Sequence, residues 1–249
     1  MITIKNAADI EGLKESCRIV VEAINLAESL IAPGLKTGEL DRIIAEFIQS
    51  AGGRPAFKGF YGYPANICTS IDEEVVHGIP GDRALQEGQI VSVDVGVEKN
   101  GWYGDAAKTF AVGAVSVEKQ RLMQVTREAL YRGIAKAVEG NRLSDIGHAV
   151  QQHVEKAGFS VVRDLVGHGI GRSMHEAPQI PNYGEPHRGP RLKEGMVFAI
   201  EPMVNAGGYA VRTLADQWTV VAEDGSCSAH FEHDVVVTRN GAIILTEGI

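Results

Sequence analysis

The stretch IVSVDVGVEKNGWYGDAAKTF, from Ile90 to Phe110, decides the fold of this chain. Two apolar, β-branched runs flank Asn100-Gly101, and Asn-Gly between such runs is the strongest short signal for a β-hairpin. With these two residues as the turn, Asp94 lies opposite Ala107 and shares a face with Asp105. The stretch therefore predicts a hairpin with two neighbouring carboxylates, which a shift of one residue in register would separate.

The surroundings of Asp94 indicate that its carboxylate is buried. Valines occupy positions 91, 93, 95 and 97 on either side of it. A lone buried charge is very costly, and no Lys or Arg occurs between the two aspartates before Lys99. Two acids on one dry face favour a bound cation, although a solvated face with two unrelated acids remains the alternative at this point.

Composition limits the class of protein. The chain has 249 residues, of which 44% are hydrophobic and 22% charged, so it can form one large domain or two small ones. The net charge of −8 argues against nucleic acid as the main partner. Cys17, Cys68 and Cys227 show no C-x-x-C spacing, which excludes a thiolate zinc knuckle and indicates a reducing compartment.

No targeting or membrane signal is present in the sequence. The start of the chain lacks a charged segment followed by an apolar run. No apolar run approaches the ~20 residues that a membrane span requires. We therefore expect a cytoplasmic protein with no membrane partner.

Apolar periodicity predicts four helices and a short strand at 67–71 before the hairpin. The first helix runs over 9–30 and ends at Pro33-Gly34. The other three begin at the N-caps Thr37, Ser116 and Ser144, and end at Gly52, Gly140 and Gly158.

The chain also contains an internal repeat. A shift of 107 residues aligns Leu85–Asp94 with Leu192–Glu201. A His-x-x-Pro segment precedes each of these strands, and an acid-led strand follows each, beginning at Asp105 and at Glu232. We interpret the pattern as two repeats, about 10–113 and 116–240, within a single catalytic domain 1–249, with chance similarity of two α/β halves as the alternative. The prediction is an α+β fold of two pseudo-symmetric halves, with a mainly antiparallel central sheet covered by helices on one face.

Pairing two such halves brings Asp94, Asp105, Glu201 and Glu232 to one central site. His168, in Val-Gly-His-Gly-Ile-Gly, adds an accessible imidazole. Four carboxylates and one imidazole suit Mn, Fe(II), Co or Zn, and two ions sharing carboxylates can activate water and polarise a carbonyl. His77 and His175, from the two His-x-x-Pro segments, can handle protons or hold the reacting amide, although a structural role is the simpler interpretation of each histidine alone.

These motifs, in this order, closely resemble methionine aminopeptidase type I over nearly the whole chain. The matching pieces are His77-Gly-Ile-Pro80, Asp94 with Asp105, Gly167-His168-Gly-Ile-Gly171, His175-Glu-Ala-Pro178, Glu201-Pro202 and Glu232-His233. The resemblance implies the pita-bread fold, in which two pseudo-symmetric halves enclose two divalent metal ions.

The resemblance also implies roles for individual residues. Asp105 and Glu232 would bridge both ions, Asp94 would hold one, and His168 with Glu201 would hold the other. Glu201 would be the general base for a water or hydroxide that bridges the ions. His175 would contact substrate and stabilise the transition state, and His77 would lie near the scissile amide nitrogen.

The methionine pocket of the family is lined by aromatic residues and a cysteine. The matching positions are Phe57, Phe60, Tyr63, Cys68, Met174 and Trp218. Phe57 stands where the family often has Cys, and Met174 where it often has Phe, so the pocket stays apolar. Packing in the core is the simpler interpretation of Cys68 and Met174.

The implied activity is removal of the N-terminal Met from nascent polypeptides near the ribosome when the second residue is small. The expected form is a monomer with two ions of Co, Mn, Fe or Zn. One alternative is a prolidase-like dipeptidase, which would need basic residues to anchor a substrate carboxylate. The other is a binding protein of the same fold without metal, which is disfavoured because all five candidate ligands are present.

Overall fold

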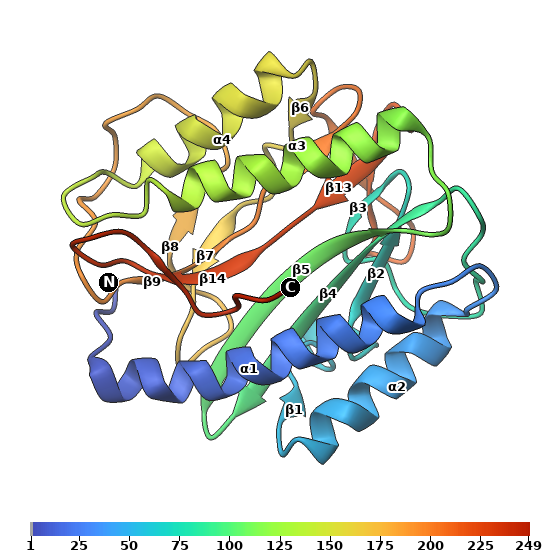
Figure 1. Cartoon of the computed structure of the whole chain (residues 1–249), viewed down its shortest axis with the longest axis horizontal. Helices are drawn as coiled ribbons and strands as arrows, with labels where there is room; N and C mark the ends of the chain where they lie inside the picture. Colours follow the sequence, from blue (N-terminus) through green and yellow to red (C-terminus); the bar gives the residue numbers. More distant parts are fainter. Residues whose placement is uncertain (1) are drawn as a thin grey trace.

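The computed structural model describes residues 2–249, and its helices lie on one face of a central layer of strands (Figure 1). Two helices belong to each half of the chain and lie beside one another in that half. They are α1 (Ala7–Leu30), α2 (Thr37–Ser50), α3 (Val117–Ile134) and α4 (Ser144–Lys156). The predicted α+β class, with helices on one face, is confirmed. No helix in residues 2–249 combines the length and the apolar character that crossing a membrane requires.

Two predicted helix ends differ from the structure. The first helix begins at Ala7 rather than at residue 9, because the Asn6 side chain accepts hydrogen bonds from the Ala8 and Asp9 N–H groups. The helix from Val117 ends at Ile134, so the prediction that it continues to Gly140 was wrong. Its last predicted turn is replaced by a β-bridge between Val138 and Thr238.

Thr37 and Ser144 each open a helix, but neither is its N-cap as predicted. Their hydroxyls instead accept hydrogen bonds from backbone N–H groups of a loop further along the chain. Thr37 Oγ1 accepts the Gly81 N–H at 2.9 Å, and Ser144 Oγ accepts the Arg188 N–H at 2.7 Å. The two contacts occupy corresponding places in the two halves, and each ties a helix start to the loop leading into a central strand.

The named strands pair antiparallel throughout. The first half contributes β1 (Arg54–Pro55), β2 (Cys68–Ile71), β4 (Ile90–Lys99) and β5 (Trp102–Ala111). The second half contributes β7 (Gly167–Gly169), β8 (Glu176–Ile180), β9 (Val197–Ile200), β14 (His233–Val236) and β15 (Ile243–Ile244). Two smaller sheets contain β3 (Glu74–Val76), β11 (Val211–Thr213) and β12 (Val220–Ala222), and β6 (Ser160–Val161), β10 (Met203–Asn205) and β13 (Ser228–His230).

The β4–β5 hairpin has the predicted register. Asp94 pairs with Ala107 and Gly96 pairs with Asp105. Asn100 and Gly101 have φ of 54° and 76°, the left-handed pair that a two-residue type I′ turn requires. The turn therefore sets which face of the hairpin carries the two aspartates.

Each half has its own apolar core between its helices and its strands. In the first half, Ile24, Ile44 and Val93 are buried in one cluster. In the second half, Leu122 and Phe198 are buried in another. In each half the helices pack against one face of the strands through this core. The packing fixes the position of the strands.

Candidate metal centre

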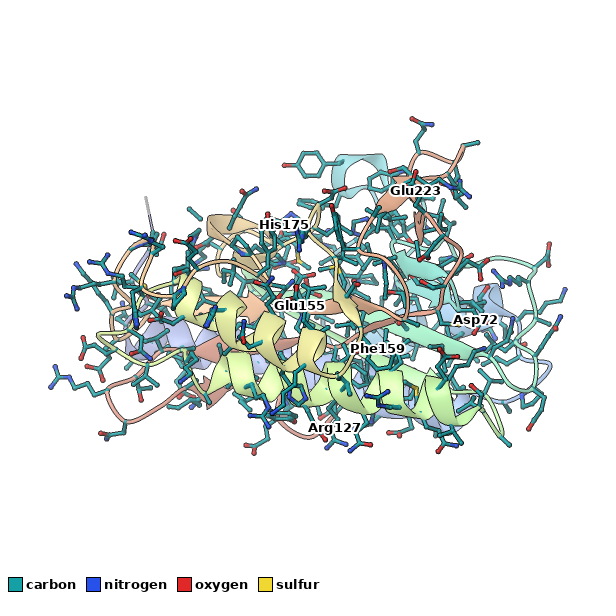
Figure 2. The ribbon with its side chains drawn as sticks, turned by 90° about the horizontal axis from the view of Figure 1, so that it is seen from above. Asp72, Arg127, Glu155, Phe159, His175 and Glu223 are labelled. Atoms are coloured by element: carbon teal, nitrogen blue, oxygen red, sulfur yellow. The ribbon has the colours of Figure 1, made fainter. Side chains whose placement is uncertain are left out.

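A cavity of about 400 Å³ lies between the two halves and is lined by residues of both. His175, at its edge, lies on the side of the sheet away from α3, the helix that carries Arg127 (Figure 2). The helix layer therefore closes one face of the sheet, and the cavity opens toward the other.

The structure brings the four predicted acids together in this cavity. Asp94 comes from β4 and Asp105 from β5. Glu201 follows β9 directly, and Glu232 lies between β13 and β14. Asp105 is only 4% exposed and Glu232 1%, so these carboxylates face one another rather than bulk water.

His168 contributes an imidazole to the same cluster. Its Nε2 lies 3.5 Å from Glu201 Oε1 and 3.8 Å from Asp105 Oδ2. Its Nδ1 lies 3.0 Å from the Gly169 carbonyl oxygen, which only accepts, so Nδ1 carries the proton and Nε2 has a free lone pair. Burial lowers the pKa of His168 to about 3, which keeps the ring in the neutral form that binds metal.

Burial also disfavours charge on the four acids. It raises the pKa of Asp94 to about 7 and that of Glu201 to about 8. The pKa values of Asp105 and Glu232 are raised well above their usual range, first by burial and then by the neighbouring acids. No Lys or Arg of the described chain lines the cavity, so positive charge for these carboxylates has to come from a bound cation.

The donor atoms fit divalent metal ions. Asp94 Oδ1, Asp105 Oδ1, Glu232 Oε1 and His230 Nε2 are buried and find no hydrogen-bond partner within residues 2–249. Buried polar atoms are rarely left unpaired, because each costs free energy comparable to a lost hydrogen bond. Carboxylate oxygens with imidazole nitrogens are the ligand type of Mn, Fe, Co and Zn sites. A metal centre accounts for the three carboxylate oxygens at once, since all three belong to candidate ligands.

The two histidines of the His-x-x-Pro segments lie at the cavity wall. The His175 ring is 4.3 Å from the His168 ring and packs edge-on against Phe60 at 5.2 Å. His77 has φ of 59°, a left-handed conformation that is uncommon outside glycine. Burial, followed by His230 and His175, lowers the pKa of His77 to about 4, so this ring is neutral near pH 7.

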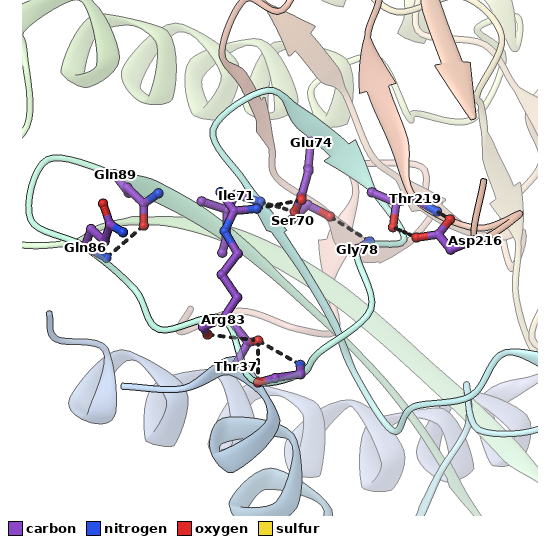
Figure 3. A network of polar contacts seen from close by, with 11 residues as sticks. Thr37, Ser70, Ile71, Glu74, Gly78, Arg83, Gln86, Gln89, Asp216 and Thr219 are labelled. Carbon is purple, nitrogen blue, oxygen red and sulfur yellow. Dashed lines mark hydrogen bonds and ion pairs between the residues drawn. The ribbon is translucent and has the colours of Figure 1, made fainter. Parts of the chain in front are cut away.

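Hydrogen bonds of Gly78 fix the backbone directly after His77, and Figure 3 shows the one to Ser70. The Gly78 N–H donates to Ser70 Oγ at 3.1 Å, and its carbonyl accepts from Thr69 N–H and from the Tyr63 hydroxyl. A Cβ at Gly78 would lie 2.2 Å from the Thr69 carbonyl oxygen, so only glycine fits here.

Other contacts in Figure 3 brace the same wall. Glu74 accepts from the Ile71 N–H at 2.7 Å and from Arg83 at 2.8 Å. Asp216 accepts from the hydroxyl of Thr219 at 2.6 Å and fixes the turn that carries Trp218. Polar contacts outside the cavity thus set the positions of its apolar wall.

Five of the six residues predicted for the pocket line the cavity. They are Phe57, Phe60, Tyr63, Cys68 and Trp218. Met174 is 1% exposed and is not among the residues that line the cavity, so its contact with a substrate side chain stays a prediction. Met174 and Phe57 both pack onto Gly96, where an added Cβ would come within 2.8 Å of Met174 and 2.5 Å of Phe57.

Sequence reasoning missed several residues of the cavity, and His230 is the most informative. Its Nε2 lies 3.5 Å from Glu201 Oε2, and the residue is 2% exposed. The His-x-Glu spacing to Glu232 is a signal that could have found it, because alternate residues of an extended chain share a face. Tyr61 and Met203 also line the cavity and had no such signal.

Comparison with known proteins agrees with this geometry. The model of metallopeptidase family M24 matches residues 11–239. The methionine aminopeptidase of Clostridium acetobutylicum is 53% identical over 247 residues, covering 99% of both chains. Methionine aminopeptidase 1 of Bacillus subtilis is 51% identical over 246 residues, again covering 99% of both.

Solved structures give the same result. The methionine aminopeptidase of Thermotoga maritima superposes with a TM-score of 0.97 at 46% identity, covering 99% of each chain. The prolidase of Pyrococcus horikoshii superposes with a TM-score of 0.81 at 22% identity and shares the fold, but this chain covers only 64% of it. The pita-bread fold and the family resemblance expected from the sequence are confirmed, and the chain belongs to metallopeptidase family M24.

Proposed function

We propose that this aminopeptidase removes the N-terminal Met of new polypeptides whose second residue is small, using two divalent metal ions. One observation carries the proposal: five candidate ligands stand at the base of a cavity whose wall is aromatic and apolar. The named relatives, at 51% to 53% identity over 99% of the chain, support the same activity.

The ligand assignment follows the clustering of the donor atoms. Asp105 and Glu232 are the most enclosed of the four candidate acids and would bridge the two ions. Asp94 would complete one site, and His168 with Glu201 the other. When bound, such ions polarise a carbonyl and lower the pKa of water, which is the chemistry that amide hydrolysis needs.

The protein groups around the scissile bond have separate tasks. Glu201 lies between two imidazoles and would accept the proton of the attacking water. His175, beside His168, would hold the substrate carbonyl, and neutral His77 would face the scissile amide nitrogen. The roles of His175 and His77 require neutral imidazoles, and burial lowers the pKa of both rings.

The apolar wall supports recognition of methionine. Tyr63 and Trp218 pack edge-on at 5.1 Å, with Phe57 and Cys68 beside them. Aromatic rings and a thiol offer favourable contacts to a thioether side chain. No Lys or Arg within the described part of the chain lines this cavity, which disfavours the dipeptidase alternative, since a dipeptide's carboxylate would need a cationic anchor.

The expected setting is the cytoplasm, where a monomer would act on nascent chains as they leave the ribosome. Cys17, Cys68 and Cys227 are free thiols, which suits a reducing compartment. The net charge of −8 makes nucleic acid an unsuitable substrate.

Release of free Met from the peptides Met-Ala-Ser and Met-Leu-Ser tests the proposal. The assay is run with Mn, Co or Fe(II) supplied to chelator-treated protein, and metal content is measured in parallel. We expect cleavage of Met-Ala-Ser and little of Met-Leu-Ser. Equal cleavage of both would contradict the specificity, and protein that binds no metal would support the non-catalytic alternative.

A further inference from the structure

His230 is a buried imidazole in the candidate metal centre that the five-ligand set leaves without a task. It is the last residue of β13, where it pairs with Met203 of β10. Its N–H donates to Thr109 Oγ1 at 2.9 Å, and its carbonyl accepts from the same hydroxyl at 2.8 Å. Contacts to β5 of one half and β10 of the other therefore fix where the ring stands.

The distance between His230 and Glu201 does not describe a hydrogen bond. The Nε2–Oε2 separation is 3.5 Å, whereas a charge-assisted hydrogen bond would be about 2.7–2.9 Å. Nε2 is also buried and has no hydrogen-bond partner within the described chain. Two ligands about 2.1 Å from one ion, in octahedral or tetrahedral geometry, lie about 3.0–3.4 Å apart. The observed separation is close to that of two donors around a common cation.

A third donor completes the group. Single ligand atoms of Glu201, His230 and Glu232 all lie within 4.8 Å of one another. Asp105, His168 and Glu232 form a second group by the same measure. Glu232 belongs to both groups, as a bridging carboxylate would, and each group contains one imidazole.

We propose that His230 is a sixth protein ligand of the dinuclear centre, binding through Nε2 an ion that also receives Glu201 Oε2 and Glu232. Glu201 Oε1 faces His168, so Glu201 would contribute one oxygen to each ion rather than only to the ion of His168. The proposal rests on the proposed function only in requiring two bound ions. Each ion then has one nitrogen ligand, and the carboxylate of Glu201 lies between the two imidazoles. Imidazole favours Fe, Co and Zn over Mn, so His230 increases the preference of its ion for these metals.

The test counts nitrogen ligands directly. In the protein loaded with two Co(II) ions, proton NMR shows one set of strongly shifted imidazole signals for each coordinated histidine. We expect two sets in the wild-type protein and one set in His230→Gln. One set in the wild-type protein would overturn the proposal without the need for any variant.

Metal binding by calorimetry supplies a second readout. His230→Gln should bind one of two Co(II) ions more weakly by at least about 10- to 100-fold, the loss that removing even a hydrogen-bonding partner of a ligand causes, and its Co-over-Mn preference should fall. The glutamine amide can still donate a hydrogen bond to Glu201, so unchanged affinity and unchanged Co(II) absorption would assign His230 a hydrogen-bonding role and refute ligation. A wild-type protein that binds no second ion would refute the dinuclear function itself, which is a separate result.

His233→Gln is the matched control. His233 is also a buried histidine, at 3% exposure, but its ring contacts the Tyr131 and Thr246 hydroxyls and does not line the cavity. Its replacement should leave both Co(II) affinities and both signal sets unchanged. Thermal unfolding of the chelator-treated variants shows whether each one folds before its metal binding is compared.

Discussion

The backbone N–H of Glu232 donates a 2.9 Å hydrogen bond to the carbonyl oxygen of Ala107. Ala107 pairs with Asp94 in the β4–β5 hairpin, so this bond joins the two halves where each supplies an acid to the cavity. Two residues further along, Asp234 Oδ2 accepts the N–H of Asp105 at 2.9 Å. The relative placement of acids from different halves is thus set by hydrogen bonds from the backbone N–H groups of Glu232 and Asp105, one to a backbone carbonyl and one to the buried Asp234 carboxylate.

Glu201→Gln should retain the fold and lose most of the turnover. The amide cannot accept the proton of the attacking water, and loss of a general base typically lowers kcat about 10²- to 10⁴-fold. Steady-state release of Met from Met-Ala-Ser measures the effect. Metal content is determined alongside, and a near-normal kcat in fully loaded variant would remove Glu201 from this role.

Removal of metal should make stability fall as pH rises. The pKa values of Asp94 and Glu201 are raised by burial to about 7 and about 8, whereas unfolded carboxyls titrate near 4. Between about pH 4 and pH 8 the folded state therefore binds more protons than the unfolded state. The resulting stabilisation is complete below about pH 4 and is lost as pH rises to about 8.

Thermal unfolding at pH 6 and pH 8, with a chelator or with Mn, measures this dependence. The chelator-treated protein should have the lower Tm at pH 8, and added Mn should raise Tm most at that pH because the cation stabilises the charged carboxylates. If the chelator-treated protein were equally stable at both pH values, the pKa values of Asp94 and Glu201 would not be raised in the metal-free protein.

Gly78→Ala should both destabilise the protein and impair catalysis. The new Cβ would lie 2.2 Å from the Thr69 carbonyl oxygen, and backbone has to move to relieve the overlap. Overpacking of this kind costs about 1–3 kcal/mol, and the movement would displace His77. Urea unfolding and kcat/KM measure the two effects.

Gly81→Ala is the control for this substitution. A Cβ at Gly81 meets nothing within 4 Å, and its φ lies outside the left-handed region. Its unfolding free energy should stay within about 0.5 kcal/mol of the wild-type value. Equal effects of the two substitutions would show that the tight contact at Gly78 has no consequence.

Trp218→Ala should raise KM for Met-Ala-Ser more than it lowers kcat. The indole packs edge-on against Tyr63 at 5.1 Å, lines the apolar wall and is not one of the candidate ligands. Loss of contacts made equally in the ground state and the transition state raises KM alone. Ile243→Ala, at a side chain that is 52% exposed, provides the comparison. A pure loss of kcat would place Trp218 in the chemical step instead.

Local chemistry in the sequence determined the hairpin and its two aspartates. Asn100-Gly101 specifies the turn, and the turn fixes the register, so Asp94 and Asp105 follow without tertiary information. The acids Glu201 and Glu232 were found because the internal repeat places them at the positions of Asp94 and Asp105. Features that depend on local backbone conformation, such as the Asn100-Gly101 turn, can therefore be predicted from the sequence alone.

Only the tertiary structure decided the features that depend on long-range packing. The helix α3 ends at Ile134, and Val138 forms a bridge with Thr238 instead of continuing the helix. The local sequence does not predict this long-range pairing. Met174 is buried against Gly96, a residue distant in sequence, and only the fold shows this contact. His230 joins the metal centre because strands of both halves hold its backbone beside Glu201. The sequence supplied the residue types and the local turns, whereas the meeting of the two halves decided which donor atoms share one site.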